Sequence, residues 1–313
     1  MSFCFVKNKT VCYNVVMKKI IAIIGTTASG KSDLGIYLAQ KLNGEVVSCD
    51  SRQVFKGLDL GSGKVSKEEQ KMAVHHMLDV VEPGKTYSVA EFQKQAYKKI
   101  DDILSRGKLP ILVGGTGLYV RSITDGYVFS EVAPNESVRK QLSSNTREEL
   151  IEKLVSLGED KNKIAGLSPA HLVRRIEVKL SSEQKKPNAP KYEVLKIGLT
   201  FPREELKKRI GQRIDVRLEQ GMLDEVQGLL DNGVSPDFLD NLGLEYRYIS
   251  RYLLGKISRD EFYNSLWKDT NSFAKRQMTW FKADKPIWLC PNDPSWQQQA
   301  LKLAQDFLKQ SRY

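Results

Sequence analysis

The eight residues at 25–32, GTTASGKS, constrain the fold of this chain more than any other stretch. They match GxxxxGK[ST] in full, follow the short apolar run KIIAII at 19–24, and precede a helix-prone segment from Ser32 to about Leu42. An apolar run of this length that ends at a glycine is typical of a buried parallel strand. A strand, a glycine-rich loop and a helix in this order predict a P-loop α/β domain.

The same motif predicts a phosphate site. Its glycines let backbone N–H groups converge on a polyphosphate, and the helix N-terminus adds partial positive charge. Lys31 supplies a full charge, and the Ser32 hydroxyl is a ligand for Mg²⁺. We therefore assign phosphate binding to Gly25, Thr26, Thr27, Ala28, Ser29, Gly30, Lys31 and Ser32, and the metal site to Ser32. The motif does not say which molecule carries the phosphates.

Alternating strand and helix patterns continue after the loop. Glu45–Cys49 and Pro110–Val113 have the pattern of further strands, and 89–105 has the pattern of a helix. The apolar face of that helix consists of Ala90, Phe92, Ala96, Ile100, Ile103 and Leu104. This order predicts a doubly wound parallel sheet that binds ligands at the carboxyl ends of its strands.

The pattern changes near Tyr127, and strand character returns at Tyr192–Thr200. We expect a helical insertion at 128–190, set into a P-loop core domain formed by 17–127 and 191–313. The segment from Arg203 to about Phe281 is expected to be helical. Met17 is followed by KKIIAIIG, which is typical of a protein start, so residues 1–16 are expected to be an extension without a role in the fold.

Composition narrows the functional class. The net charge of +11 favours a polyanionic partner, although charge counts as evidence only beside a binding site. The four cysteines lack CxxC spacing, which indicates reduced thiols without a disulfide framework or a zinc site. No apolar stretch approaches the ~20 residues of a membrane span. We expect a cytoplasmic monomer that does not bind membranes.

Two strand ends carry candidate chemistry. Asp50 follows the second strand, where a carboxylate can act as a general base or can position Mg²⁺ or cap the loop; position alone leaves these roles open. Gly114-Gly115-Thr116-Gly117 closes the third strand. Its glycines permit close approach of a ligand or backbone, and a tight turn explains them equally well.

Basic and imidazole side chains form three further candidate groups. Arg209, Arg213 and Arg217 recur every four residues and make a stripe that can bind diphosphate or RNA, or can be a solvated helix face. Residues 275–282, KRQMTWFK, interleave cations with aromatics, which suits stacking on unpaired bases or packing of the Trp into a core. Adjacent His75 and His76 would point to opposite faces of a strand, so a shared metal is not expected.

Together these segments resemble the tRNA dimethylallyltransferases, also called isopentenyl-tRNA transferases. The matching stretches are GTTASGKS, SCDSRQVFKGLDLGSGK, HHMLDV, YSVAEF, GKLPILVGGTGLYV, RRIEV, the RIGQR helix with GMLDEV, and AKRQMTWF. They occur in order from Ile20 to about Phe281, so the resemblance covers nearly the whole chain.

The resemblance implies that dimethylallyl diphosphate fills the phosphate loop, with Mg²⁺. The acceptor would be N6 of adenosine 37, in the anticodon stem-loop of tRNAs that read codons beginning with U. It implies catalytic roles for Asp50 as the base, Thr116 in placing the reacting groups and Arg213 on the diphosphate. The implied tRNA-binding residues are Asp50, Ser51, Arg52, Gln53, His171, Arg174, Arg247, Lys275, Arg276, Gln277, Trp280 and Lys282.

The chain departs from the family pattern in three places. Gly61-Ser62-Gly63-Lys64-Val65 stands where GTAKP is usual, His171 replaces an Arg, and Leu242–Arg247 replaces an AVGYR-like segment and introduces Glu245. No paired cysteines follow residue 281, which favours a bacterial type without the zinc finger of eukaryotic relatives.

Three alternatives remain at this stage. They are a P-loop small-molecule or nucleotide kinase, an adenylate isopentenyltransferase that acts on free nucleotide, and a P-loop protein that binds RNA without catalysis.

Overall fold

The computed structural model describes residues 17–130, 132, 135–181 and 187–310. The expected extension at 1–16 lies outside the described residues. The strands are β1 (Lys18–Gly25), β2 (Gly44–Ser48), β3 (His75–His76), β4 (Leu109–Gly114), β5 (Tyr192–Leu199) and β6 (Ile287–Leu289). The helices are α1 (Lys31–Lys41), α2 (Lys67–Met72), α3 (Val89–Ser105), α4 (Gly117–Thr124), α5 (Glu136–Leu142), α6 (Arg147–Ser156), α7 (Lys161–Ile164), α8 (Pro169–Leu180), α9 (Arg203–Glu219), α10 (Met222–Asp231), α11 (Pro236–Leu242), α12 (Leu244–Leu253), α13 (Arg259–Lys282) and α14 (Trp296–Lys309).

The six strands form one parallel sheet in the order β3-β2-β4-β1-β5-β6. The prediction of a parallel α/β sheet is therefore confirmed. β1 lies between β4 and β5, and the chain moves outward to β2 on one side before it crosses to β5 on the other. The loops that follow β1, β2 and β4 consequently meet at one edge, beside the point where the strand order reverses.

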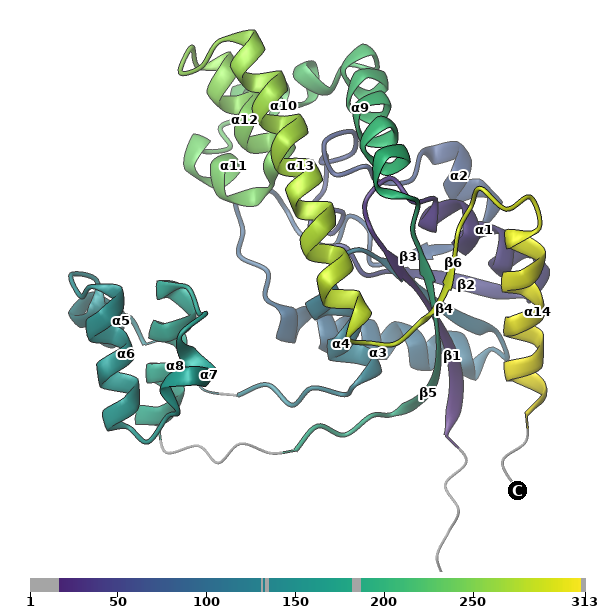
Figure 1. Cartoon of the computed structure of the whole chain (residues 1–313), viewed down its shortest axis with the longest axis horizontal. Coiled ribbons are helices and arrows are strands. Elements are labelled where there is room, and N and C mark those ends of the chain that lie inside the picture. The colour runs from purple at the N-terminus through teal and green to yellow at the C-terminus, as the bar shows by residue number, and fades with distance from the viewer. Residues whose placement is uncertain (1–16, 131, 133–134, 182–186, 311–313) are drawn as a thin grey trace, which may run out of the picture. The chain divides into compact units, whose positions relative to one another are not determined.

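Helices cover both faces of the sheet. α1 and α14 pack on one face, and α3, α4 and α13 pack on the other (Figure 1). Alternate residues of β1 supply the two cores, with Ile20 and Ile24 in one cluster and Ile21 and Ile23 in the other. All four side chains are fully buried. A central parallel strand needs this continuous apolar run because it has no solvent-facing side.

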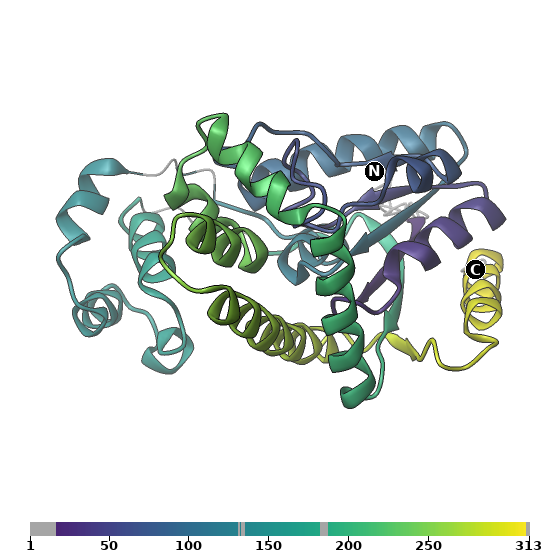
Figure 2. The same ribbon diagram turned by 90° about the horizontal axis from the view of Figure 1, so that it is seen from above.

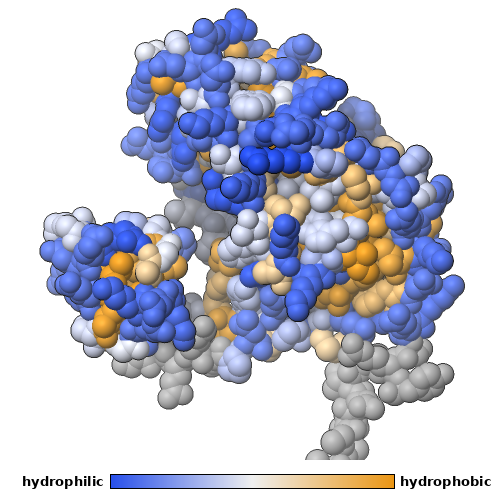
Figure 3. Space-filling model, viewed as in Figure 1, coloured by the Kyte–Doolittle hydropathy of each residue, from blue (hydrophilic) through white to orange (hydrophobic). Residues whose placement is uncertain are grey.

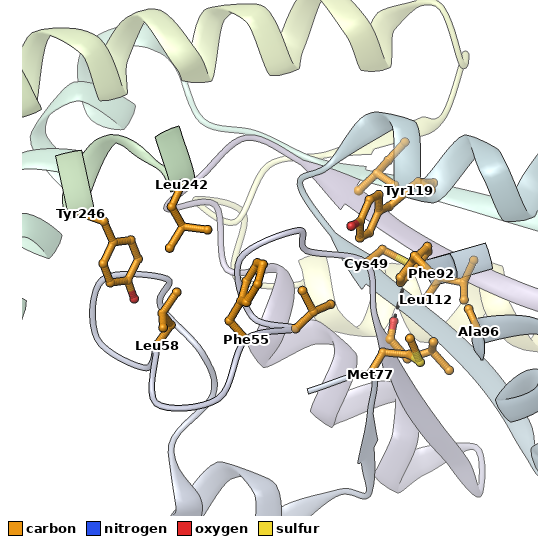
Figure 4. Packing of buried hydrophobic residues seen from close by; sticks show 14 of the residues in the cluster. Cys49, Phe55, Leu58, Met77, Phe92, Ala96, Leu112, Tyr119, Leu242 and Tyr246 are labelled. Carbon is orange, nitrogen blue, oxygen red and sulfur yellow. Dashed lines mark hydrogen bonds between the residues drawn. The ribbon is translucent and has the colours of Figure 1, made fainter. Parts of the chain in front are cut away.

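The core beneath α3 and α4 continues under the C-terminal helices. The rings of Phe92 and Tyr119 stack with centroids 4.0 Å apart. Figure 4 shows the same cluster extending through Phe55 and Leu58 to Tyr246 of α12. α9 and α13 lie next to each other in both ribbon views (Figures 1 and 2). The C-terminal helices are thereby packed onto the loops at the binding edge.

Local signals account for α3. Ser88 and Glu91 form a capping box at its N-terminus, and the helix spans the predicted residues. Phe92, Ala96, Ile100 and Ile103 are buried as expected. Ala90 is exposed, so its assignment to the apolar face was wrong. It lies in the first turn, before the helix reaches the sheet.

The two histidines take part in structural contacts away from the phosphate loop. His76 Nε2 lies 2.7 Å from Glu45 Oε2. Arg106 and Lys108 also donate to the buried Glu45 carboxylate, and the Arg106 hydrogen bonds hold its pKa well below the usual range despite burial. His75 Nδ1 contacts the Ala73 carbonyl at 2.8 Å. This charged cluster fixes the amino-terminal end of β2.

The chain divides into two compact units, one formed by Met1–Gly126 with Pro190–Tyr313 and the other by Tyr127–Ala189. The smaller unit contains α5, α6, α7 and α8 around its own apolar cluster, which includes Leu150, Leu154 and Ile176. In the larger unit, the face drawn in Figure 3 is mostly hydrophilic over α10, α11 and α12, and hydrophobic side chains gather near β5, β6 and α14. Among the described residues, no helix has the length and apolar character to cross a membrane.

Candidate nucleotide and phosphate site

The phosphate loop connects β1 to α1 through a series of strained backbone positions. Gly25 has φ +146°, and a Cβ there would lie 2.2 Å from the Leu199 carbonyl oxygen, so only glycine fits. Ala28 and Gly30 also have positive φ, and Ser29 Oγ donates to the Thr26 carbonyl at 2.8 Å. These turns bend the backbone around the N-terminus of α1, which is the form that a phosphate cradle requires.

Lys31 lies against this loop with its ammonium group donating to the Thr26 carbonyl. Burial, reinforced by repulsion from Arg213, lowers the Lys31 pKa to about 7, although Asp50 opposes the shift. A lysine with this depressed pKa is short of a counter-charge. An anion in the cradle would restore its charge, which is the electrostatic signature of a ligand site.

α9 brings two of its three striped arginines to the loop. Arg209 Nε donates to the Ala28 carbonyl at 3.1 Å, and Arg213 Nη1 donates to Thr27 Oγ1 at 2.8 Å. The alternative interpretation of the arginine stripe, a helix face exposed to solvent, is therefore wrong for Arg209 and Arg213. Burial and the neighbouring Arg217 lower the pKa of Arg213, so this guanidinium also lacks a compensating anion.

Gln277 of α13 connects the phosphate loop to the loop after β4. Its Oε1 accepts from Thr27 N at 2.8 Å, and its Nε2 donates to the Gly115 carbonyl at 2.9 Å. The side chain is buried. Gln277 was predicted to contact tRNA; the structure instead places both ends of its amide between two loops of the site.

The glycines after β4 make room for protein atoms. A Cβ on Gly114 would lie 2.2 Å from the Cys49 carbonyl oxygen, and one on Gly115 would lie 2.5 Å from Gln277 Nε2. A Cβ on Gly117 would lie 2.2 Å from Trp280 Nε1. Close approach of backbone is therefore observed at Gly114, against the residue that follows β2, whereas side chains of α13 approach Gly115 and Gly117.

Asp50 lies where β2 ends beside this turn. Its Oδ1 accepts from Arg52 N at 2.8 Å and from Gln53 N at 3.4 Å, so the carboxylate caps the loop. No residue that the structure describes donates a hydrogen bond to Oδ2. One carboxylate oxygen is thus oriented by the backbone and the other is available, an arrangement that accommodates a general base as well as a cap.

Side chains beside Asp50 hold the same segment. Thr116 Oγ1 accepts from Ser51 N at 3.1 Å, which joins the ends of β2 and β4. Gln53 lies between Ser48 Oγ at 2.9 Å and the Gly63 carbonyl at 3.0 Å. The predicted group of Asp50, Ser51, Gln53 and Thr116 is therefore brought together in one place.

The loop at 59–64 is fixed by a carboxylate that the motif analysis did not assign to the site. Glu225 of α10 accepts from the N–H groups of Asp59, Leu60 and Gly61 at 2.9, 2.6 and 3.0 Å, and from Tyr246 Oη at 2.9 Å. Lys64 Nζ donates to Asp59 Oδ1 at 2.6 Å and also to Asp79. An acidic residue inside the matching stretch GMLDEV was the available signal, but nothing local indicated what it binds.

Glu245, which departs from the family pattern, has a charged neighbour in the structure. Glu245 Oε1 lies 3.8 Å from Arg217 Nη1, so the carboxylate faces the arginine stripe. Arg217 in turn lies against Gly63 of the 59–64 loop. The acidic side chain that departs from the family pattern is therefore matched by an arginine of the same protein.

The predicted RNA-binding residues of α13 remain on the surface, apart from Gln277. Lys275, Arg276 and Lys282 are exposed. Trp280 is 42% exposed, and its ring lies 4.8 Å from the Arg121 guanidinium. This row of cations with an exposed indole remains a prediction for RNA contact.

Three of the remaining candidates for tRNA binding, Arg174, His171 and Arg247, have side-chain partners within the protein. Arg174 donates to the Val132 carbonyl at 2.7 Å and to the buried Glu177 at 3.2 Å. His171 is exposed and contacts Ser168 Oγ at 2.7 Å. Arg247 Nε donates to the Asp240 carbonyl at 2.7 Å, and Arg52 lies near Gly243, where a Cβ would be 3.1 Å from its Nε.

Charge in the insertion is nearly balanced. Residues 128–190 contain eleven Lys and Arg and nine Asp and Glu, a net +2 out of +11 for the chain. Most of the excess positive charge therefore belongs to the residues outside the insertion.

The residues present suit a Mg²⁺ ion that is coordinated mainly by oxygens of the bound phosphate compound. Ser32 is in the first turn of α1, next to Lys31, and its hydroxyl forms no hydrogen bond among the described residues. No group of three or more His, Cys, Asp or Glu that could hold a metal occurs among the described residues. The ion would take its other oxygens from phosphate and water, as Mg²⁺ commonly does.

The chain is similar to known proteins over most of its length. The IPP transferase family model matches residues 53–284, and the isopentenyl transferase model matches residues 18–85. The chain is 41% identical to tRNA dimethylallyltransferase 2 of Shewanella sediminis, covering 91% of this chain and 97% of the relative. It is 39% identical to tRNA dimethylallyltransferase of Streptococcus agalactiae, with coverage of 93% and 98%.

Solved structures match as well. The tRNA isopentenylpyrophosphate transferase of Bacillus halodurans aligns with a TM-score of 0.72 at 32% identity, covering 93% of this chain and 97% of that one. A eukaryotic dimethylallyltransferase acting on tRNA aligns with a TM-score of 0.77 at 27% identity, covering 94% and 82%. The resemblance drawn from the sequence motifs is confirmed: this chain belongs to the IPP transferase family.

Proposed function

We propose that this protein transfers the dimethylallyl group of dimethylallyl diphosphate to N6 of an adenosine in tRNA. The observation that carries the proposal is the convergence of the phosphate loop, Arg213 and Asp50 at one edge of the sheet. The names of the relatives support the same activity. The finer target is adenosine 37 of tRNAs that read codons beginning with U, and it rests on the family resemblance alone.

Different residues of this chain would act on the amine and on the leaving group. The exocyclic amine is a poor nucleophile because its lone pair is delocalised into the ring. As N6 attacks C1 of the prenyl group, its proton passes to Asp50 Oδ2, while the C1–O bond breaks and its electrons go to the diphosphate. Lys31, Arg213 and the loop N–H groups stabilise the charge that gathers on this leaving group. Mg²⁺ held by Ser32 and the diphosphate would add Lewis-acid stabilisation.

RNA binding is the less constrained part of the proposal. The acceptor base must leave its stack to reach the strand ends, where Ser51, Arg52 and Gln53 would contact it. Exposed Lys275, Arg276, Trp280 and Lys282 would bind the backbone and stack on unpaired bases. A cytoplasmic location and a monomeric state are part of the same proposal.

Label transfer from dimethylallyl diphosphate tests the function. The protein with Mg²⁺ is offered unmodified tRNA containing A36 and A37, free AMP, or tRNA with A37 replaced by G, and ATP hydrolysis is measured alongside. We expect label only in the tRNA that contains A37. Label in AMP alone would assign the protein to the nucleotide prenyltransferases, and ATP consumption without label would indicate a kinase.

A further inference from the structure

Arg217 is the member of the arginine stripe to which the proposed mechanism assigns no role, although it is placed like a ligand-binding residue. It lies one helical turn beyond Arg213 on α9, and its side chain is only 12% exposed. Its one charged partner among the described residues is Glu245, at 3.8 Å, beyond hydrogen-bond distance. No hydrogen bond from its guanidinium to any described residue is present. Five donors are therefore left without an acceptor in a largely buried position.

The two guanidinium groups of Arg213 and Arg217 lie against each other at Gly63. A Cβ placed on Gly63 would be 1.5 Å from Arg217 Nη2 and 2.1 Å from Arg213 Nη2. The two nitrogens are therefore separated by no more than the sum of these distances, close to van der Waals contact. Gly63 has φ +63°, so both its conformation and its neighbours exclude a side chain. Glycine at this position makes room for a second arginine.

Two cations in near contact are unfavourable without a counter-charge. Burial lowers the pKa of both groups, and mutual repulsion contributes at Arg213. Glu245 is the nearest carboxylate, with Asp50 acting over a longer range. A phosphate group that accepted hydrogen bonds from both guanidiniums would remove the repulsion and satisfy their donors.

We propose that Arg217 is a second anion-binding arginine, which acts with Arg213 on the diphosphate of the prenyl donor. Glu245 partly balances the charge of Arg217 while no anion is bound, and Gly63 provides the space for the guanidinium. The assignment to the diphosphate follows from Arg213, whose Nη1 is already bound to Thr27 Oγ1 of the phosphate loop. The inference rests on the proposed function for the identity of the ligand.

A charge-balanced double variant separates this role from a structural one. Arg217→Met alone is ambiguous, because it also leaves Glu245 unpaired near the site, where its charge repels anions. Arg217→Met with Glu245→Gln removes one positive and one negative charge, so the net charge of the site is unchanged. Binding of inorganic pyrophosphate with Mg²⁺ to the full-length protein is measured by calorimetry.

We expect Arg217→Met to weaken pyrophosphate binding by about tenfold or more, the loss that one charged hydrogen bond represents. The double variant should stay about tenfold weaker than the unmodified protein. Glu245→Gln alone should bind pyrophosphate at least as tightly as the unmodified protein. Arg251→Met is the matched control, because Arg251 of α12 is another arginine paired with a carboxylate, that of Asp240 in α11. The pyrophosphate affinity of this variant should be unchanged.

Two results would overturn the proposal. If the double variant regains the affinity of the unmodified protein, Arg217 only neutralises Glu245. If Arg217→Met keeps pyrophosphate affinity and loses affinity for tRNA, the guanidinium binds a nucleic-acid phosphate instead. Gly63→Ala is a second variant, expected to weaken pyrophosphate binding by displacing both guanidiniums. Failure of the proposed function would show separately, as absence of label in tRNA with the unmodified protein.

Discussion

Gln277→Leu tests whether the site is held by the amide that joins its two loops. Leucine keeps much of the buried volume but leaves Thr27 N–H without its acceptor and the Gly115 carbonyl without its donor. A buried polar group that loses its partner costs about 1–3 kcal/mol. With two such groups, we expect the free energy of unfolding to fall by about 3 kcal/mol.

Urea unfolding followed by tryptophan fluorescence is the suitable assay. All four tryptophans, Trp267, Trp280, Trp288 and Trp296, belong to the larger unit, so the signal does not report the insertion. Gln298→Leu, at an exposed position of α14, is the control and should change the free energy by less than about 0.5 kcal/mol. Pyrophosphate affinity should also fall in Gln277→Leu, because the cradle is less ordered before binding. A loss of stability no larger than that of the control would refute the reasoning.

Two further predictions follow from the geometry. Glu225→Gln keeps one carbonyl oxygen for four donors, so the free energy of unfolding should fall by about 3 kcal/mol, measured by the same fluorescence assay; an unchanged urea midpoint would show that the 59–61 loop does not depend on this carboxylate. The Lys31 pKa of about 7 means that this amine is mostly neutral at pH 8 in the free protein. A bound anion raises that pKa, so pyrophosphate binding should take up protons at pH 8 and weaken as pH rises above about 7. Calorimetry in buffers of different ionisation enthalpy measures the uptake, and a Lys31→Met variant that retained all of it would contradict this assignment.

The sequence predicted the framework of the molecule because the relevant signals are local. The apolar run before Gly25, the loop after it and the capping box at Ser88 each act within a few residues. β3 and β6 were not predicted, since strands of two and three residues are too short to show a pattern. They exist because neighbouring strands offer them a hydrogen-bonding edge.

The candidate site was predicted in part, for the same reason. Residues of the phosphate loop and Asp50 were placed correctly at one edge, because parallel strands bring their carboxyl ends together. The link from Gln277 to Thr27 spans 250 positions, and no local pattern encodes it. The residues around Gln277 suggested RNA contact, because a glutamine next to lysine, arginine and tryptophan is also typical of an exposed RNA-binding surface.

Long-range packing also connects two of the three departures from the family pattern. Gly63 and Glu245 looked like unrelated changes in the sequence, yet both lie against Arg217 of α9. The structure therefore brings three positions together. Arg217 has space beside Gly63 on one side and the carboxylate of Glu245 on the other. Periodicity identified the arginine stripe but could not say which of its members lacked a partner.

Single-turnover label transfer by Asp50→Asn tests the central claim most directly. Asparagine keeps an oxygen for the N–H groups of Arg52 and Gln53, so the loop cap is preserved while the base is removed. With dimethylallyl diphosphate and tRNA both bound, we expect transfer to slow by about a hundredfold or more, the contribution typical of a general base. Pyrophosphate should still bind, because the phosphate loop, its contact with Arg213 and the cap at Arg52 are all retained. Transfer at the unmodified rate would contradict the assignment of Asp50 as the base that activates the adenosine amine.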